Sequence, residues 1–96
     1  MQRLEFLPRA RSDFDESFDW YAENSLRAAV RFADAVDLAL SRIIADSTQF
    51  ASPDGVHREC PVSRYPHRIV YRIAGDCVLI VAIAHAKRRP GYWKRR

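Results

Sequence analysis

The sequence predicts one α+β domain, residues 1–96, in which a short N-terminal strand and an α-helical hairpin precede three further strands. Two observations support this prediction. Residues 8–47 place apolar side chains at helical spacing, whereas residues 56–84 hold three shorter runs that are typical of strands. A chain of about 100 residues has the usual size of a single domain and leaves no room for a second core.

The N-terminal segment from Gln2 to Leu7 mixes apolar residues with Arg3 and Glu5, which is typical of a short strand. Pro8 ends this strand and starts a helix, because proline lacks the N–H group that would stay unpaired in a first helical turn. We expect the helix to run from about Pro8 to Glu23. Its apolar face is formed by Phe14, Phe18, Tyr21 and Ala22.

The Asn24-Ser25 pair resembles a helix cap, and a second helix is expected to follow it and to end near Ser47. Two helices joined by so short a link fold back as an antiparallel hairpin. Each helix has its own apolar face, and the two faces cannot cover each other completely, so both need the sheet. The face of the second helix is formed by Ala29, Phe32, Ala33, Val36, Leu40, Ile43 and Ile44.

Turn-forming residues at 48–55 lead into a short strand at 56–62, which Pro61 confines to a sheet edge because proline cannot donate to a ladder. In residues 67–73 the apolar Ile69, Tyr71 and Ile73 alternate with Arg68, Val70 and Arg72, and Gly75-Asp76 separates this run from the wholly apolar run at 78–84. A strand that is apolar on both faces is covered on both sides. We therefore expect a three-stranded antiparallel meander, with 78–84 as a central strand, followed by a basic C-terminal tail.

Charge is divided unevenly along the chain. Residues 1–56 hold six Lys/Arg and ten Asp/Glu, a net charge of −4, whereas residues 57–96 hold ten Lys/Arg and two Asp/Glu, a net charge of +8. A basic half favours an anionic partner such as nucleic acid or an acidic protein.

The composition excludes several classes of protein. Apolar residues at 48% and charged residues at 29% are typical of a globular protein. No apolar run approaches the roughly 18 to 20 residues of a membrane span, and no signal-peptide core follows Met1, so we expect a cytoplasmic protein without membrane contact. Cys60 and Cys77 have neither metal-site nor disulfide-framework spacing and are expected to be buried free thiols.

Three segments of the chain resemble the RelE/ParE superfamily of type II toxin-antitoxin toxins. They are Ala10–Phe14 with Trp20–Glu23, then Pro66–Ile73, then Ile83–Trp93, of which the last is the most specific. The resemblance covers nearly the whole chain. It implies a small sheet flanked by a helical hairpin and a growth-inhibiting toxin associated with plasmid stabilisation. It also implies an antitoxin protein that neutralises the toxin, and no cofactor or metal.

The superfamily contains two activities, and the fold does not choose between them. Members resembling RelE cut mRNA on the ribosome without a metal, whereas members resembling ParE poison DNA gyrase. RNA cleavage of that kind needs a base, an acid and cations over the phosphate. For it, the resemblance implies Arg68, Arg88 and Tyr92 as catalytic residues. His85 is added to this set because histidine is the side chain whose ordinary pKa lies nearest neutral pH. For binding of the target or of nucleic acid, we expect the basic and aromatic residues of the C-terminal half, namely Arg64, Arg68, Lys87, Arg88, Arg89, Tyr92, Trp93 and Lys94.

Each of these positions also has a purely structural interpretation. Arg68 fits the solvent-exposed side of a strand, and His85 fits a hydrogen-bonded histidine at a strand end. Tyr92 and Trp93 fit aromatic residues that pack the tail onto the sheet.

The lysine content favours the ParE-like subgroup. Lys87 and Lys94 are the only lysines in the chain, so the lysines that the ribonuclease members carry before the hairpin are absent. Arg58 and Arg64 cannot replace them as proton donors, because a guanidinium stays charged. In the ParE-like interpretation the protein binds gyrase and performs no chemistry; an endoribonuclease is the alternative. The expected antitoxin is apolar and acidic, and either a hetero-oligomer with it or a homo-oligomer is expected.

Overall fold

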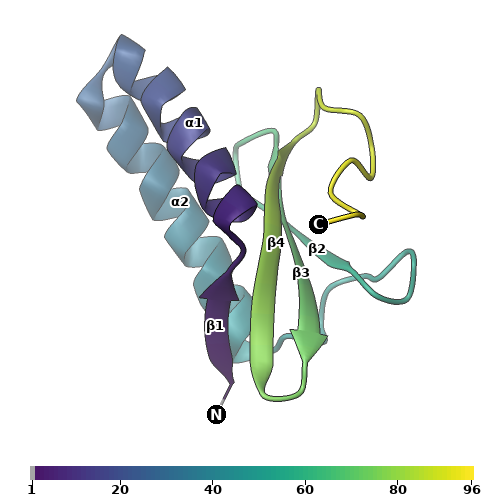
Figure 1. The fold of residues 1–96 in the computed structure, drawn as a ribbon. Helices are drawn as coiled ribbons and strands as arrows, with labels where there is room; N and C mark the ends of the chain where they lie inside the picture. The colour runs from purple at the N-terminus through teal and green to yellow at the C-terminus, as the bar shows by residue number, and fades with distance from the viewer. Residues whose placement is uncertain (1) are drawn as a thin grey trace.

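The computed structural model describes residues 2–96 as a four-stranded sheet with a helical hairpin on one face (Figure 1). The predicted order of one strand, two helices and three strands is confirmed. The elements are β1 (Arg3–Phe6), α1 (Pro8–Asn24), α2 (Leu26–Ala45), β2 (Arg58–Pro61), β3 (His67–Ala74) and β4 (Cys77–His85).

The sheet has the strand order β1-β4-β3-β2, so β4 is a central strand, as its apolar sequence predicts. Strands β2, β3 and β4 form the predicted antiparallel meander, whereas β1 lies parallel to β4. Gly75, with φ of +60°, lets the chain turn tightly between β3 and β4. Pro61 lies in the edge strand β2, where its missing N–H group faces no neighbouring strand.

Residues at the start of each helix explain where it begins. Pro8 occupies the first turn of α1, and the Ser25 hydroxyl accepts a hydrogen bond of 3.0 Å from the Ala28 N–H at the start of α2. The second helix ends at Ala45, two residues before the predicted end. Ile44 was expected on the buried face of α2 but is exposed, and Ala39 points into the core instead.

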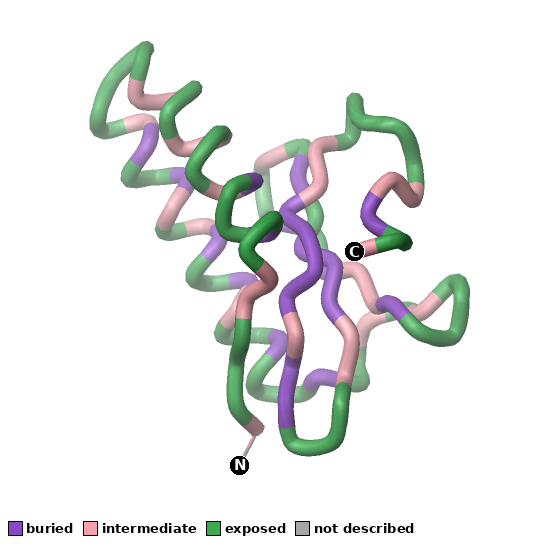
Figure 2. Tube along the Cα trace, in the orientation of Figure 1, coloured by how far each residue is buried: buried purple, intermediate pink, exposed green. Residues whose placement is uncertain are grey.

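Two hydrophobic clusters cover the two faces of the sheet, and Figure 2 shows the buried residues concentrated in β3, β4 and the inner face of α2. The larger cluster lies between the helices and the sheet. It includes Phe32, Val36, Ile43, Ile69, Tyr71 and Ile80. The smaller cluster, on the opposite face, contains Val70, Val81, Ala82 and Trp93.

Both cysteines are buried free thiols, as expected. Cys60 lies in β2 and Cys77 in β4, with β3 between them, so the sheet itself separates the two side chains. Across residues 2–96, neither helix is long and apolar enough to span a bilayer.

Candidate target-binding surface

The segment that follows β4, residues 86–96, is not a free tail. It forms a series of turns that folds back over the sheet on the face away from the helices (Figure 1), and we call it the C-terminal strap. Trp93 is only 6% exposed and packs against Val70, Val81 and Ala82. Its indole also meets the ring of His57 edge-on at 4.9 Å between centroids. The sheet thereby fixes the position of the basic residues that the strap carries.

Two clefts flank the strap. The first, of about 610 Å³, lies between α1 and the end of β4 and has a mixed apolar and charged lining that includes Asp13, Ser17, Trp20, Tyr21, His67 and Lys87. The second, of about 250 Å³, lies between the strap and the ends of β2, β3 and β4. Both clefts share His85, Ala86, Arg88 and Tyr92. These four residues therefore form a ridge that is accessible from either side.

Most of the residues selected from the sequence lie at this ridge. Arg68, His85, Arg88 and Tyr92 together line the second cleft, where Arg89 and Trp93 also lie. Lys87 lines the first cleft. The two other residues of the predicted set, Arg64 and Lys94, are exposed but line neither cleft. The second cleft thus brings together the four residues of the smaller predicted set.

The second cleft is strongly cationic. Glu59 is its single acidic side chain, and a carboxylate oxygen of Glu59 lies 3.2 Å from Nη1 of Arg68. The Arg88 guanidinium lies over the Tyr92 ring, 4.1 Å from its centroid. Burial and then the nearby Asp13 carboxylate raise the pKa of Tyr92, so its phenol stays neutral at physiological pH. Among the described residues 2–96, Arg88 takes part in no ion pair, and its guanidinium is held against the Tyr92 ring.

Trp93 fits the structural interpretation better than contact with a target, because its indole is buried in the smaller cluster. Arg68 is mostly exposed on β3, and its acidic partner belongs to the neighbouring strand β2. Trp20 is 66% exposed and lines the first cleft, so an aromatic ring stands at the entrance to that cleft.

Two histidines meet where the clefts join. Nδ1 of His85 accepts a hydrogen bond of 2.9 Å from the Lys87 backbone N–H, so the neutral ring carries its proton on Nε2. The His85 ring meets that of His67 at 4.8 Å, nearly at right angles. Burial, and secondarily the positive charge of His85, lower the pKa of His67 from 6.5 to about 4. Nε2 of His67 lies 3.2 Å from the Ser17 hydroxyl.

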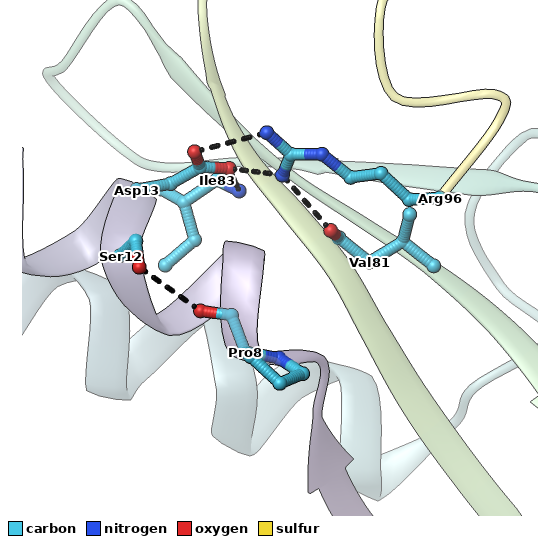
Figure 3. A network of polar contacts seen from close by, with 6 residues as sticks. All are labelled: Pro8, Ser12, Asp13, Val81, Ile83 and Arg96. Carbon is cyan, nitrogen blue, oxygen red and sulfur yellow. Dashed lines mark hydrogen bonds and ion pairs between the residues drawn. The ribbon is translucent and has the colours of Figure 1, made fainter.

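A buried ion pair closes the opposite side of the strap (Figure 3). Nη1 and Nη2 of Arg96 contact the two carboxylate oxygens of Asp13 at 2.7 and 3.2 Å, and each side chain is only 9% exposed. The same carboxylate accepts the backbone N–H of Ile83 at 3.1 Å. Hydrogen bonding to Asp13 raises the pKa of Arg96. Arg96 is thus neutralised within the fold, in contrast to the other arginines of the strap.

Neither Asp13 and Arg96 nor Ser17 and His67 were selected from the sequence. Their spacing in the sequence could have indicated Asp13 and Ser17. They follow Ala10 by three and seven residues, which places them on the helix face that packs against β4. A polar residue at a core position of a helix needs a partner. Among the described residues 2–96, no cluster of three or more His, Cys, Asp or Glu side chains is suited to hold a metal ion.

Comparison with known proteins agrees with this architecture. A sequence profile described as the ParE toxin of the type II toxin-antitoxin system parDE matches residues 4–90. The chain belongs to the ParE toxin family. A solved structure described as a chromosomal ParDE toxin-antitoxin system from P. aeruginosa resembles this ParE-family chain with a TM-score of 0.77 and 20% sequence identity. The match covers 88% of this chain and 96% of that one. Curated protein sequences contain no match.

Membership of the ParE family confirms the recognition and the fold predicted from the sequence. It identifies this ParE-family protein as the toxin component of a type II toxin-antitoxin system.

Proposed function

We propose that this ParE-family toxin inhibits DNA gyrase in the cytoplasm by binding, without catalysing a reaction, and that a protein antitoxin neutralises it. The observation that carries the proposal is the family match over residues 4–90, taken together with the cationic ridge at the two clefts. Gyrase with its bound DNA offers an anionic surface, and basic clefts attract such surfaces over long distances.

The side chains at the ridge are suited to binding an anion. Arg88 is exposed and stacks on Tyr92, and Arg89 is also exposed. Guanidinium groups that lie over an aromatic ring keep their hydrogen-bond donors directed outward for a phosphate or carboxylate. Tyr92 holds Arg88 in this position, so we assign phosphate or carboxylate contact to Arg88 and support to Tyr92.

The same side chains are poorly suited to RNA cleavage. The raised pKa of Tyr92 makes its phenol a weak proton donor, and His67 is buried with its pKa lowered to about 4. Nδ1 of His85 is occupied by the Lys87 N–H, which leaves Nε2 as the nitrogen able to exchange a proton with a ligand. One histidine cannot be base and acid on the two sides of a phosphate at once.

A ribosome-dependent mRNA endonuclease remains the second candidate, because Arg68, His85, Arg88 and Tyr92 line one cleft. A His85→Gln substitution separates the two functions. It removes the one histidine among the residues that line the second cleft, so it should abolish RNA cleavage, whereas inhibition of gyrase should change less than about threefold.

The test is direct. Purified protein is added to gyrase in a supercoiling assay and, separately, to translating ribosomes whose mRNA is mapped for new 5′ ends. We expect loss of supercoiling and an intact message, and in cells filaments with a DNA-damage response. Arg88→Gln should weaken gyrase inhibition about tenfold or more, whereas Arg95→Gln, which removes an equally exposed charge outside both clefts, should not. Cut mRNA with unaffected supercoiling would reverse the assignment.

We further propose that the antitoxin binds as an extended or helical segment, rich in apolar and acidic residues, over the basic half of the toxin. The ridge at Arg88 and Tyr92 borders both clefts, so a segment lying in either cleft would cover part of the surface assigned to gyrase. Raising salt from 0.1 to 0.5 M should weaken the complex, because exposed charges are screened over about 10 Å or less in this range. An affinity that does not change with salt would contradict the electrostatic contribution.

A further inference from the structure

The C-terminal strap is attached to the body of the protein at two separate points. Trp93 packs into the smaller hydrophobic cluster on one face of the sheet. Arg96 reaches around the edge of β4 to Asp13 of α1 and also donates to the backbone carbonyl of Val81, at 3.2 Å (Figure 3). Arg88, its supporting residue Tyr92 and the exposed Arg89 lie between β4 and these two attachments in the chain.

The second attachment fills a gap in the sheet. Strand β1 pairs with β4 only as far as Ile80, whose carbonyl accepts the Leu7 N–H at 2.9 Å. Beyond that point β4 has no neighbouring strand on this side, and a register shift between β3 and β4 leaves Val81 without a direct partner. Asp13 accepts the Ile83 N–H, and Arg96 donates to the Val81 carbonyl. The ion pair therefore satisfies backbone groups that an additional strand would otherwise satisfy.

The Asp13–Arg96 attachment also contacts the ridge, through Tyr92. The Arg96 guanidinium lies 5.1 Å from the centroid of the Tyr92 ring, and the Arg88 guanidinium lies 4.1 Å from the same centroid. Tyr92 thus contacts both the anchored arginine and the exposed one. Removing one partner would leave the other as an unpaired buried charge, which is strongly unfavourable, and the strap can avoid that state by detaching.

We propose that Asp13 and Arg96 form a positioning latch that keeps the strap closed and so holds Tyr92 and Arg88 in place for the target. Closure of the strap is independent of what the target is, and only the effect on the target rests on the proposed function. Arg96 lies outside residues 4–90, which the family profile matches, so the family match does not itself assign the latch.

Closure is measured by chymotrypsin cleavage after Trp93, because a buried indole must leave its cluster before the protease can bind it. In the full chain, Asp13→Asn and Arg96→Gln should each speed cleavage after Trp93 by about tenfold or more. Asp15→Asn and Arg95→Gln are the matched controls. They remove the same charges from exposed positions on the same helix and the same strap, and cleavage should match that of the unaltered protein.

The combined Asp13→Asn and Arg96→Gln variant tests whether the two residues act as a unit. It should open the strap no more than either single substitution, because the second change removes a group that has already lost its partner. Arg96→Lys keeps the charge but not the two parallel hydrogen bonds, so its cleavage rate should fall between those of the unaltered protein and Arg96→Gln. Additive effects in the double variant would overturn the latch.

The effect on the target is read in the gyrase assay. Asp13→Asn should weaken inhibition about tenfold, although Asp13 is a buried residue of α1 and does not belong to the ridge. Thermal unfolding and the cleavage map elsewhere in the chain should show that α1 remains intact. If Asp13→Asn or Arg96→Gln unfolds completely, the cleavage rate and gyrase inhibition of Arg96→Lys are compared with those of the unaltered protein instead. Normal closure of the strap in Asp13→Asn and Arg96→Gln, or normal inhibition with an open strap, would overturn the proposal. Failure of the unaltered protein to inhibit gyrase would instead refute the proposed function and leave the cleavage result standing.

Discussion

The stability of this protein should fall as the pH drops from 7 to 5, and His67 should be the main cause. His67 is 3% exposed. The groups that face it are the Ser17 hydroxyl and Tyr21 ring of α1, the Phe32 ring of α2, Tyr65 of the loop before β3, and His85 of β4. Among these neighbours there is no carboxylate that could stabilise a positively charged His67.

The magnitude follows from the two pKa values. The pKa of His67 is about 4 in the folded protein, against 6.5 without the burial. The unfolded chain therefore binds the proton more readily, so protonation favours unfolding. The stability that depends on His67 being neutral is fully present above about pH 6.5, and it is lost progressively as the pH falls toward 4. The difference between the two pKa values corresponds to about 3 kcal/mol of unfolding free energy. Of this, about 2 kcal/mol should be lost between pH 7 and pH 5.

The assay is urea unfolding at pH 7 and at pH 5, with His67→Gln as the test variant. Glutamine can still hydrogen-bond to Ser17 but does not titrate, so the variant should lose about 2 kcal/mol less than the unaltered protein over this interval. His85→Gln is the control and should keep most of the pH dependence, because burial is the larger cause of the lowered pKa. The reasoning fails if His67→Gln and the unaltered protein lose the same free energy of unfolding.

Three further predictions follow from single side chains. Tyr71→Phe should lower the free energy of unfolding by about 1 to 3 kcal/mol in urea titrations, because the buried Tyr71 hydroxyl donates to the Ser47 carbonyl at 2.6 Å; an unchanged value would mean that water replaces the hydroxyl. Gly91→Ala should cost about 1 to 2 kcal/mol by thermal unfolding and speed strap opening, because Gly91 has φ of +74° and its new Cβ would lie 3.2 Å from Lys94. Cys60 should react slowly with iodoacetamide at pH 8, since burial raises the pKa of its thiol, and unfolding in urea should remove this protection; fast labelling of the folded protein would contradict the buried position.

The sequence predicted most of the elements because each depends on local chemistry. Proline at position 8, a serine cap at position 25 and a Gly-Asp turn at 75–76 mark element boundaries that need no knowledge of the rest of the chain. The apolar run in β4 predicted a central strand for the same reason. The parallel pairing of β1 with β4 was not predicted, because alternation within β1 says nothing about which strand lies beside it.

The candidate site was predicted in part. Arg68, Arg88 and Tyr92 were selected by their resemblance to family residues, and His85 because histidine titrates near neutral pH. The fold places all four in one cleft, and their roles stay predictions. The latch was missed because its two residues are 83 positions apart in the sequence. Arg96 looks like any other cation of a basic tail, and only the fold distinguishes it from Arg95.

The parallel pairing of β1 with β4 has a consequence for biosynthesis. The first strand to leave the ribosome has no hydrogen-bonding neighbour until the last strand has been made, since Arg3–Phe6 aligns with Cys77–Ile80. A nascent chain that ends before β4 therefore has a helical hairpin whose apolar side is uncovered, and such contacts between distant parts of a chain form slowly. The complete sheet, and with it the C-terminal strap that follows β4, therefore forms only after the last strand has been made.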